Sequence, residues 1–163
     1  MNIRPATLND LQPILDIYNH AVLNSTATAE YYAHTLDMRR EWYDVHMEDG
    51  LPILVAENEQ GQVVGWSSLS KFHSRYGYRF TAEDSVYIAE GWRGQGLGKQ
   101  LVSPLIVRAR ELGLRTIIAS IDSKGEASIR LHKSLGFQQV GYLSEVIYKF
   151  DHWLDTVFMQ LML

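Results

Sequence analysis

A glycine-rich turn between a strand and a helix constrains the fold of this chain more than any other segment. Residues 85–89 are mostly apolar and predict a strand, and helical periodicity returns from Gln95. The turn between them carries glycines and cations, namely Arg93, Gly94, Gly96, Gly98 and Lys99. Glycine lets a ligand approach the backbone closely, and amides at the start of a helix attract anions. We therefore expect a phosphate or pyrophosphate group at this turn.

Two common phosphate-binding patterns do not match the turn. A P-loop requires four residues between its glycines, but only three separate Gly94 from Gly98, and Gln100 replaces the hydroxyl that would bind magnesium. The dinucleotide pattern Gly-x-Gly-x-x-Gly is not matched either, because the third glycine comes one residue too early. The pattern that fits is Arg/Gln-x-x-Gly-x-Gly/Ala, with Arg93, Gly96 and Gly98.

The rest of the chain predicts alternating helices and strands. Thr7 is placed to cap a first helix, in which apolar residues recur at spacings of three, four and seven from Leu11 to Val22. We expect an α/β (α+β) fold in one domain, residues 1–163, with a mixed central sheet of about six to seven strands flanked by about four helices. The expected helices cover residues 7–22, 38–48, 95–112 and 127–135, and the expected strands cover residues 2–4, 53–56, 63–66, 85–89, 116–121, 142–149 and 155–161.

Composition argues against several classes of function. The chain has no cysteine, which removes disulfides, thiolate metal sites and a cysteine nucleophile. Its net charge of −4 argues against a nucleic-acid-binding face, and its six histidines show no dense ligand spacing, so we expect no metal. No apolar run approaches the roughly 20 residues of a membrane span. The first residues show no signal pattern, so we expect a cytoplasmic protein.

The turn and its flanking elements resemble the GNAT superfamily of N-acetyltransferases, and the order of elements matches that fold nearly end to end. The resemblance implies acetyl-CoA as co-substrate, with its pyrophosphate on the turn. It also implies that residues 86–88 lie on a strand that splays from its neighbour and contacts the pantetheine and thioester. The implied cofactor-binding residues are Val86, Tyr87, Ile88, Arg93, Gly94, Gln95, Gly96, Leu97, Gly98, Lys99, Gly125, Ser128 and Ser134.

One of these positions departs from the family pattern. Gly125 stands where the family usually has an asparagine that contacts the pantetheine. Loss of that hydrogen bond would weaken cofactor binding by about 1 kcal/mol. A backbone group or Ser128 could replace it.

Residues 81–87 read Thr-Ala-Glu-Asp-Ser-Val-Tyr, similar to a segment of the phosphinothricin, methionine sulfoximine and L-amino acid N-acetyltransferase subgroup. This resemblance implies Glu83 as general base. Asp84 is the alternative, but neighbouring strand residues point to opposite faces. His132 precedes Gly136 by four residues, where many family members have tyrosine, and the resemblance implies a second acid–base group there. A purely structural histidine is the alternative.

A basic, aromatic segment before this strand is a candidate acceptor site. Arginine binds carboxylates in bidentate fashion, and aromatic side chains beside it can form an apolar wall. The resemblance implies acceptor-binding residues in this segment, at Glu83 and near the C-terminus, where Trp153 closes the pocket of a homodimer: Phe72, Arg75, Tyr78, Arg79, Glu83 and Trp153. Tyr31 and Tyr32 are candidates for its border. For the loop residues the alternative is an ordinary solvated loop, and for Trp153 it is the core.

Together these features predict acetyl transfer from acetyl-CoA to the amine of a small carboxylate-bearing acceptor, by direct attack in a ternary complex. Methionine sulfoximine, phosphinothricin, methionine sulfone and L-amino acids are the expected acceptors. Acetylation of a different amine would also fit: a polyamine, an aminoglycoside or a protein N-terminus. A polycationic acceptor would need an acidic pocket, however, whereas this loop offers arginines. Two interpretations without catalysis remain, a CoA-binding sensor module and a generic phosphate-binding protein.

Overall fold

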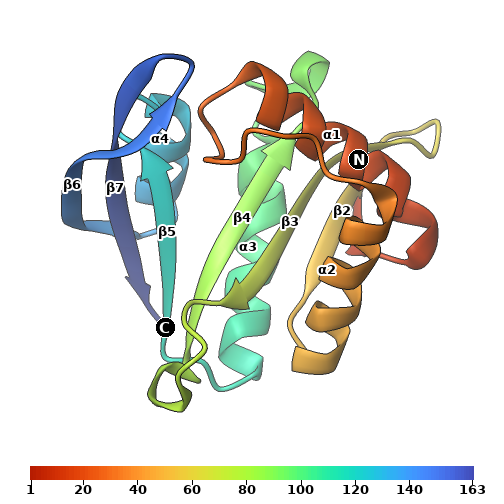
Figure 1. The fold of residues 1–163 in the computed structure, drawn as a ribbon. Coiled ribbons are helices and arrows are strands. Elements are labelled where there is room, and N and C mark those ends of the chain that lie inside the picture. Colours follow the sequence, from red (N-terminus) through yellow and green to blue (C-terminus); the bar gives the residue numbers. More distant parts are fainter.

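The computed structural model describes residues 1–163 and contains seven strands and four α-helices, as the sequence predicts (Figure 1). No helix combines the length and the apolar character needed to cross a membrane. In chain order the elements are β1 (Asn2–Pro5), α1 (Leu11–Asn24), α2 (Leu36–Asp49), β2 (Ile53–Glu57), β3 (Val63–Lys71), β4 (Thr81–Ile88), α3 (Leu97–Glu111), β5 (Thr116–Asp122), α4 (Glu126–Ser134), β6 (Gln138–Lys149) and β7 (His152–Met162).

The strands form one sheet in the order β1-β2-β3-β4-β5-β7-β6. All neighbouring pairs are antiparallel except β4 and β5, which are parallel. These two strands pair only from Thr81 to Glu83 of β4, against Thr116 to Ile118 of β5. Beyond Glu83 they separate, and Figure 1 shows the two arrows spreading apart towards their C-terminal ends. This confirms the expected splayed strand and opens the sheet at its centre.

Helices cover both faces of the sheet and pack against it through separate apolar clusters. On one face, Trp66 of β3 packs with Ile14 of α1 and Trp42 of α2. On the other face, Ala82 of β4 belongs to a larger cluster with Leu105 of α3. α4 lies on the α3 side, because its His132 bonds Asp84, which shares a face of β4 with Ala82.

The sequence-predicted boundaries of four strands are wrong by three to five residues. β3 ends at Lys71 rather than at residue 66, and β6 begins at Gln138 rather than at residue 142. β4 begins at Thr81 rather than at residue 85, because its first residues, although mostly polar, pair with β3 on one side and β5 on the other. β7 begins at His152 rather than at residue 155. Glu83 therefore lies inside β4, and Trp153 lies inside β7.

Local capping accounts for the start of α1 and the end of α2. Thr7 and Asp10 form a capping box, but the chain makes one 3-10 turn (Leu8–Asp10) before α1 begins. Arg4 bonds Asp10 at 2.8 Å, and this hydrogen bond holds the pKa of that carboxyl below its usual range. Gly50 ends α2 in the left-handed conformation, which glycine adopts without a steric penalty.

Candidate active site

The gap between β4 and β5 is a cavity of about 1200 Å³. It is lined by β4, the glycine-rich turn, the end of β5, the first turns of α4 and the segment that connects α1 to α2. In Figure 1 this connecting segment runs across the upper end of the sheet towards β5. The cavity therefore lies where the sheet has no backbone pairing of its own.

The glycine-rich turn has the geometry of an anion site. Gly94 and Gly96 have φ of 75° and 78°, and a Cβ at either position would meet no atom within 4 Å, so their backbone faces open space. Gly96 caps α3, and it lines the cavity together with Leu97 and Gly98 of the first turn, whose amides have no partner within the helix. Arg93 and Lys99 line the same cavity, and Arg93 Nε donates to the carbonyl of Ile88 at 3.2 Å. These residues fit a pyrophosphate group.

Gly98 and Gln95 have different structural roles from Gly94 and Gly96. A Cβ on Gly98 would lie 2.8 Å from Cδ2 of Leu131, so this glycine lets α3 and α4 pack closely. Gln95 does not line the cavity, and its side chain donates to the carbonyl of Gly91 at 3.2 Å. Their contribution to anion binding is therefore limited to the backbone.

The remaining residues predicted to contact the cofactor all line the cavity, and they are Val86, Tyr87, Ile88, Leu97, Gly125, Ser128 and Ser134. Gly125 caps α4, and a Cβ there would lie 3.0 Å from the carbonyl oxygen of Asp122. An asparagine would be crowded in this backbone conformation, which accounts for the glycine. Ser134 Oγ donates to the carbonyl of Leu131 at 2.7 Å.

Glu83 lies at the point where β4 and β5 separate. It is the last residue of β4 paired with β5, and its half-buried side chain lines the cavity. Burial raises the pKa of Glu83, the nearby charge of Asp84 raises it further, and a hydrogen bond from Ser120 opposes both effects. A carboxylate with a raised pKa is better matched to proton transfer near neutral pH.

His132 forms a buried pair with Asp84. The histidine is 2% exposed, with Nε2 2.9 Å from Asp84 Oδ2 and Nδ1 2.8 Å from the carbonyl oxygen of Ser128. Nδ1 must donate, because a carbonyl only accepts. Burial alone would lower the pKa of His132, but the hydrogen bond and charge of Asp84, with the Ser128 carbonyl, outweigh it and raise that pKa. The ring is therefore held in one orientation, and its surroundings favour the protonated form more than water does.

The segment between α1 and α2 is fixed over the cavity by contacts that the sequence did not reveal. Lys149 is buried, and its Nζ donates to the carbonyls of Ser25 and Thr28 at 2.8 Å each. The Thr26 hydroxyl donates to Asp122 at the end of β5. These contacts bridge the two halves of the split sheet on top of the cavity. Lys149 lies more than 120 positions from its partners in the sequence, so no local pattern could have indicated them.

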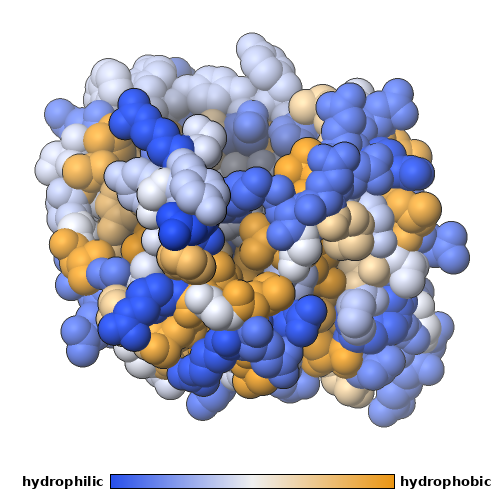
Figure 2. All heavy atoms as spheres, turned by 90° about the horizontal axis from the view of Figure 1, so that it is seen from below, coloured by the Kyte–Doolittle hydropathy of each residue, from blue (hydrophilic) through white to orange (hydrophobic).

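The predicted acceptor residues outside β4 do not line this cavity. Arg75 and Arg79 are exposed, and the Arg79 guanidinium lies 4.3 Å from the ring centroid of Tyr76. The loop that carries both residues, with Phe72 and Tyr78, lies at the lower end of Figure 1, the end seen in Figure 2, where hydrophobic patches alternate with hydrophilic side chains. Trp153 is 60% exposed and packs beside Tyr148; Tyr31 and Tyr32 are also exposed.

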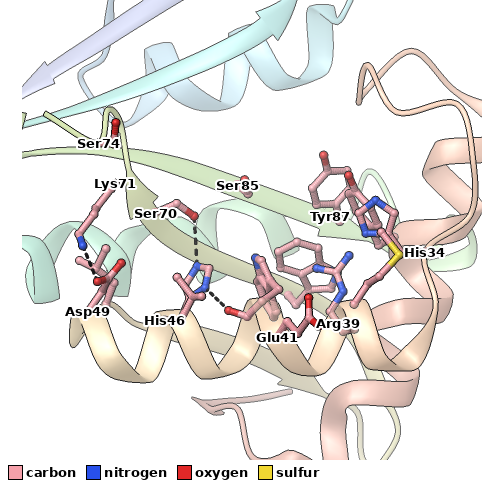
Figure 3. Close-up of a pocket in the computed structure, with 16 residues that line it drawn as sticks. His34, Arg39, Glu41, His46, Asp49, Ser70, Lys71, Ser74, Ser85 and Tyr87 are labelled. Atoms are coloured by element: carbon pink, nitrogen blue, oxygen red, sulfur yellow. Dashed lines mark hydrogen bonds and ion pairs between the residues drawn. The ribbon is translucent and has the colours of Figure 1, made fainter.

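A second cavity, of about 750 Å³, lies between α2 and strands β3 and β4 (Figure 3). It shares Ser85 and Tyr87 with the first cavity, so the two meet at β4. Arg39 of α2 lines it and was not among the residues singled out from the sequence. The sequence does indicate that Arg39 shares a helix face with aromatic residues, because Trp42 and His46 follow it by three and seven positions.

Comparisons with known proteins agree with this geometry. The family model of the acetyltransferase (GNAT) domain matches residues 3–158. An L-methionine sulfoximine/L-methionine sulfone acetyltransferase of Pseudomonas aeruginosa is 45% identical over 160 residues, which cover 98% of this chain and 93% of that protein.

Two solved structures are similarly close. A phosphinothricin acetyltransferase of Sinorhizobium meliloti in complex with AcCoA is 39% identical, with a TM-score of 0.97 over 99% of this chain and 88% of that one. A ribosomal-protein-alanine N-acetyltransferase of Brucella melitensis is 44% identical, with a TM-score of 0.97 over 100% of both chains. The resemblance inferred from the sequence is confirmed. The chain belongs to the GNAT acetyltransferase family and is an acetyl-CoA-dependent N-acetyltransferase.

Proposed function

We propose that this enzyme acetylates the primary amine of a small, carboxylate-bearing, amino-acid-like acceptor such as methionine sulfoximine, methionine sulfone, phosphinothricin or an L-amino acid. One observation carries the proposal: Glu83, with its raised pKa, lies where β4 and β5 part, next to the cavity lined by the cofactor residues. The Pseudomonas and Sinorhizobium relatives act on acceptors of this kind.

Different residues bind the cofactor and transfer protons in this reaction. Arg93, Lys99 and the amides that follow Gly96 bind the pyrophosphate. Bound acetyl-CoA supplies an activated acetyl thioester. Glu83 accepts the proton of the acceptor ammonium, directly or through a water, because only a neutral amine is a nucleophile. We assign His132 the second acid–base role; the hydrogen bond to Asp84 orients its ring and raises its pKa.

We further propose that the enzyme works as a homodimer through β6 and β7. β6 is an edge strand of 12 residues, and it exposes a series of apolar side chains. A long apolar edge is unusual on a monomer and is typical of an interface. The exposed apolar side chains on β6 and β7 are Val140, Tyr142, Leu143, Val146, Tyr148 and Trp153. Sedimentation equilibrium should give a mass of two chains, and a mass of one chain would contradict the proposal.

We also place the enzyme in the cytoplasm, since the reaction consumes acetyl-CoA. Fractionation of cells that produce the tagged protein should recover the acetyltransferase activity with the cytoplasmic markers. Recovery in an exported fraction would contradict this location.

The acceptor class is tested by release of free CoA from acetyl-CoA across a panel of amines. The panel contains methionine sulfone, methionine sulfoximine, phosphinothricin, L-amino acids, spermidine, an aminoglycoside and a peptide that begins with alanine. Turnover confined to the carboxylate-bearing amino acids would support the proposal. Turnover of only the peptide would instead assign the activity of the Brucella relative, and turnover of only the polycations would overturn the acceptor class. Tight CoA binding without any turnover would favour a sensor.

A further inference from the structure

The segment that follows α1, residues 25–29, lies across the open end of the split between β4 and β5. The two strands stop pairing beyond Glu83 and spread apart towards their C-terminal ends (Figure 1). All five residues of the segment, which we call the strap, line the cavity between the strands. The split is therefore a window with a closed perimeter, formed by β4, β5, the pairing at Glu83 and the strap.

Both strands that border the window are tied to the strap. The Thr26 hydroxyl donates to Asp122, which is the last residue of β5. The Tyr87 hydroxyl of β4 donates to the carbonyl of Ala27 at 3.4 Å. These two hydrogen bonds set the width of the window at its open end.

Lys149 holds the strap from the side of β6. It is the last residue of β6 and is 2% exposed, and its Nζ donates to the carbonyls of Ser25 and Thr28 at 2.8 Å each. Ser25 caps the C-terminus of α1, where unpaired carbonyls and the helix dipole favour a cation. No carboxylate lies within ion-pair distance of this ammonium. Because a buried charge without partners is costly, the ammonium and the strap hold each other in place.

The turn after Lys149 has an unusual backbone. Phe150 and Asp151 connect β6 to β7 with φ of 52° and 57°, so both residues are left-handed. Two-residue turns of this kind usually contain asparagine or glycine, and phenylalanine is unfavourable there. The ring centroid of Phe150 lies 5.1 Å from Lys149 Nζ, which gives the ammonium a cation–π contact. This contact, and not the turn, accounts for a phenylalanine at this position.

We propose that Lys149 is a positioning residue for acetyl transfer, and that it acts by holding the strap so that the window between β4 and β5 admits the amine to the thioester and excludes water. The two faces of β4 carry Glu83 on one side and the cofactor residues on the other, so the acetyl group is transferred across this window. Lys149 itself does not line the cavity, and its effect passes through the strap. The inference rests on the use of acetyl-CoA and not on the identity of the acceptor.

Lys149→Met tests the proposal, because it keeps the length of the side chain and removes the charge and its donors. With the strap loose, water competes with the amine for the acetyl carbon. Its oxygen bonds that carbon, the C–S bond breaks, and acetate and CoA leave, with one proton of water on the thiol and the other in solvent. The wild-type enzyme should form CoA and acetylated amine in equal amounts, and Lys149→Met should form more CoA than acetylated amine. We also expect kcat for the amine to fall by about 10-fold or more, because misplaced reactants react slowly.

The ratio of the two products distinguishes positioning from a merely structural role, because a smaller folded fraction lowers both products equally. Lys149→Arg keeps a cation with donors and should bring the ratio back towards that of the wild type. Thr26→Val loosens the strap from β5 and should raise the ratio with Lys149 in place. Lys133→Met, the same change at an exposed lysine of α4, is the control and should leave the ratio unchanged. Equal amounts of CoA and acetylated amine in both Lys149→Met and Thr26→Val would overturn the proposal.

Hydrolysis can also be followed with acetyl-CoA alone, so this test does not depend on the acceptor class. Release of CoA without any amine should be faster in Lys149→Met than in the wild type. If no amine of the panel were turned over, the proposed function would fail while this comparison still tested the strap. Equal rates of hydrolysis in the two proteins would refute the role of Lys149 alone.

Limited proteolysis of the wild-type protein needs no variant that must fold. Elastase cleaves after small residues, and Ala27 and Ala29 of the strap are exposed. Because a protease cuts a segment only when it opens, the native wild-type chain should stay intact at both alanines, as mass spectrometry would show. Cleavage there as fast as in the heat-unfolded chain would show that Lys149 does not hold the strap, and would overturn the proposal.

Discussion

The two faces of strand β4 differ in what their side chains contact. Glu83, Ser85 and Tyr87 point to the side covered by α1 and α2, where the aromatic cluster and the second cavity lie. Asp84, Val86 and Ile88 point to the side of α3 and α4, where the glycine-rich turn lies. One strand therefore separates a face suited to an acceptor from a face suited to a cofactor. The break in the sheet beyond Glu83 is where the two meet.

The largest effect is expected on the acceptor face. Glu83→Gln keeps the size of the side chain but removes the base, and proton transfer by a positioned base is worth about 10³-fold in rate. We expect kcat to fall by this factor while the dissociation constant for acetyl-CoA stays unchanged. Glu59→Gln, the same change in an exposed turn, is the control. A loss of acetyl-CoA affinity in Glu83→Gln would show that the two faces are not separate.

A smaller effect, on stability, is expected from the buried pair of the other face. His132→Asn leaves the Asp84 carboxylate buried without a charge partner, which costs about 3 kcal/mol of the free energy of unfolding. Because the pKa of His132 is raised above 6.5 in the folded protein, its contribution is complete below pH 6.5 and is lost as pH rises through the folded value. Chemical denaturation from pH 5 to 9 measures this slope, which should be absent in the variant.

His46, on the side of β4 covered by α2, is expected to show the opposite pH dependence of stability to His132. Burial lowers its pKa below 6.5, so its neutral form is favoured and stability should be lost as pH falls below 6.5. His46→Asn should therefore change the acid side of the stability curve, and His132→Asn the alkaline side. If both variants changed the same side, the opposite directions of the two pKa shifts would be wrong.

The smallest effect is expected at the glycine-rich turn. Gly96 has φ of 78°, and a Cβ there meets no atom, so Gly96→Ala costs only backbone strain of about 1–2 kcal/mol. The shifted amides should raise the dissociation constant for acetyl-CoA about 10-fold, as 1.4 kcal/mol of binding energy would. Gly113→Ala is the control, because Gly113 has φ of 71°, equally open space and no contact with either cavity. Equal acetyl-CoA affinities in the two variants would contradict the assignment.

The sequence predicted the parts of this enzyme that depend on neighbours in the chain. The glycine-rich turn, the alternating helices and strands and the splay of the strand at residues 86–88 follow from local patterns and family resemblance, and the structure has them. The start of β4 was missed because its first residues are polar and become strand only by pairing with β3 and β5. Sequence-predicted roles for Glu83 and His132 stay predictions.

Contacts between distant residues account for what was missed at the site. Asp84 was set aside as a base because neighbouring strand residues face opposite sides, and in the structure Asp84 does face away from Glu83. Its partner His132 lies 48 positions away, so the pair could not be read from a local pattern. Arg39 carried a local sign, since it shares a helix face with Trp42 and His46. Its burial among aromatic rings, however, depends on the packing of α1, α2 and the sheet, which no local pattern reveals.

The pH dependence of kcat/KM for the acceptor tests the central claim most directly, namely that Glu83 is the base on the acceptor face of β4. The wild-type enzyme should lose activity towards acid pH with a pKa above the ordinary glutamate value of 4.5, because burial raises it. In Glu83→Gln this acid limb should disappear, with acetyl-CoA affinity unchanged. Persistence of the limb in the variant would show that another group is the base.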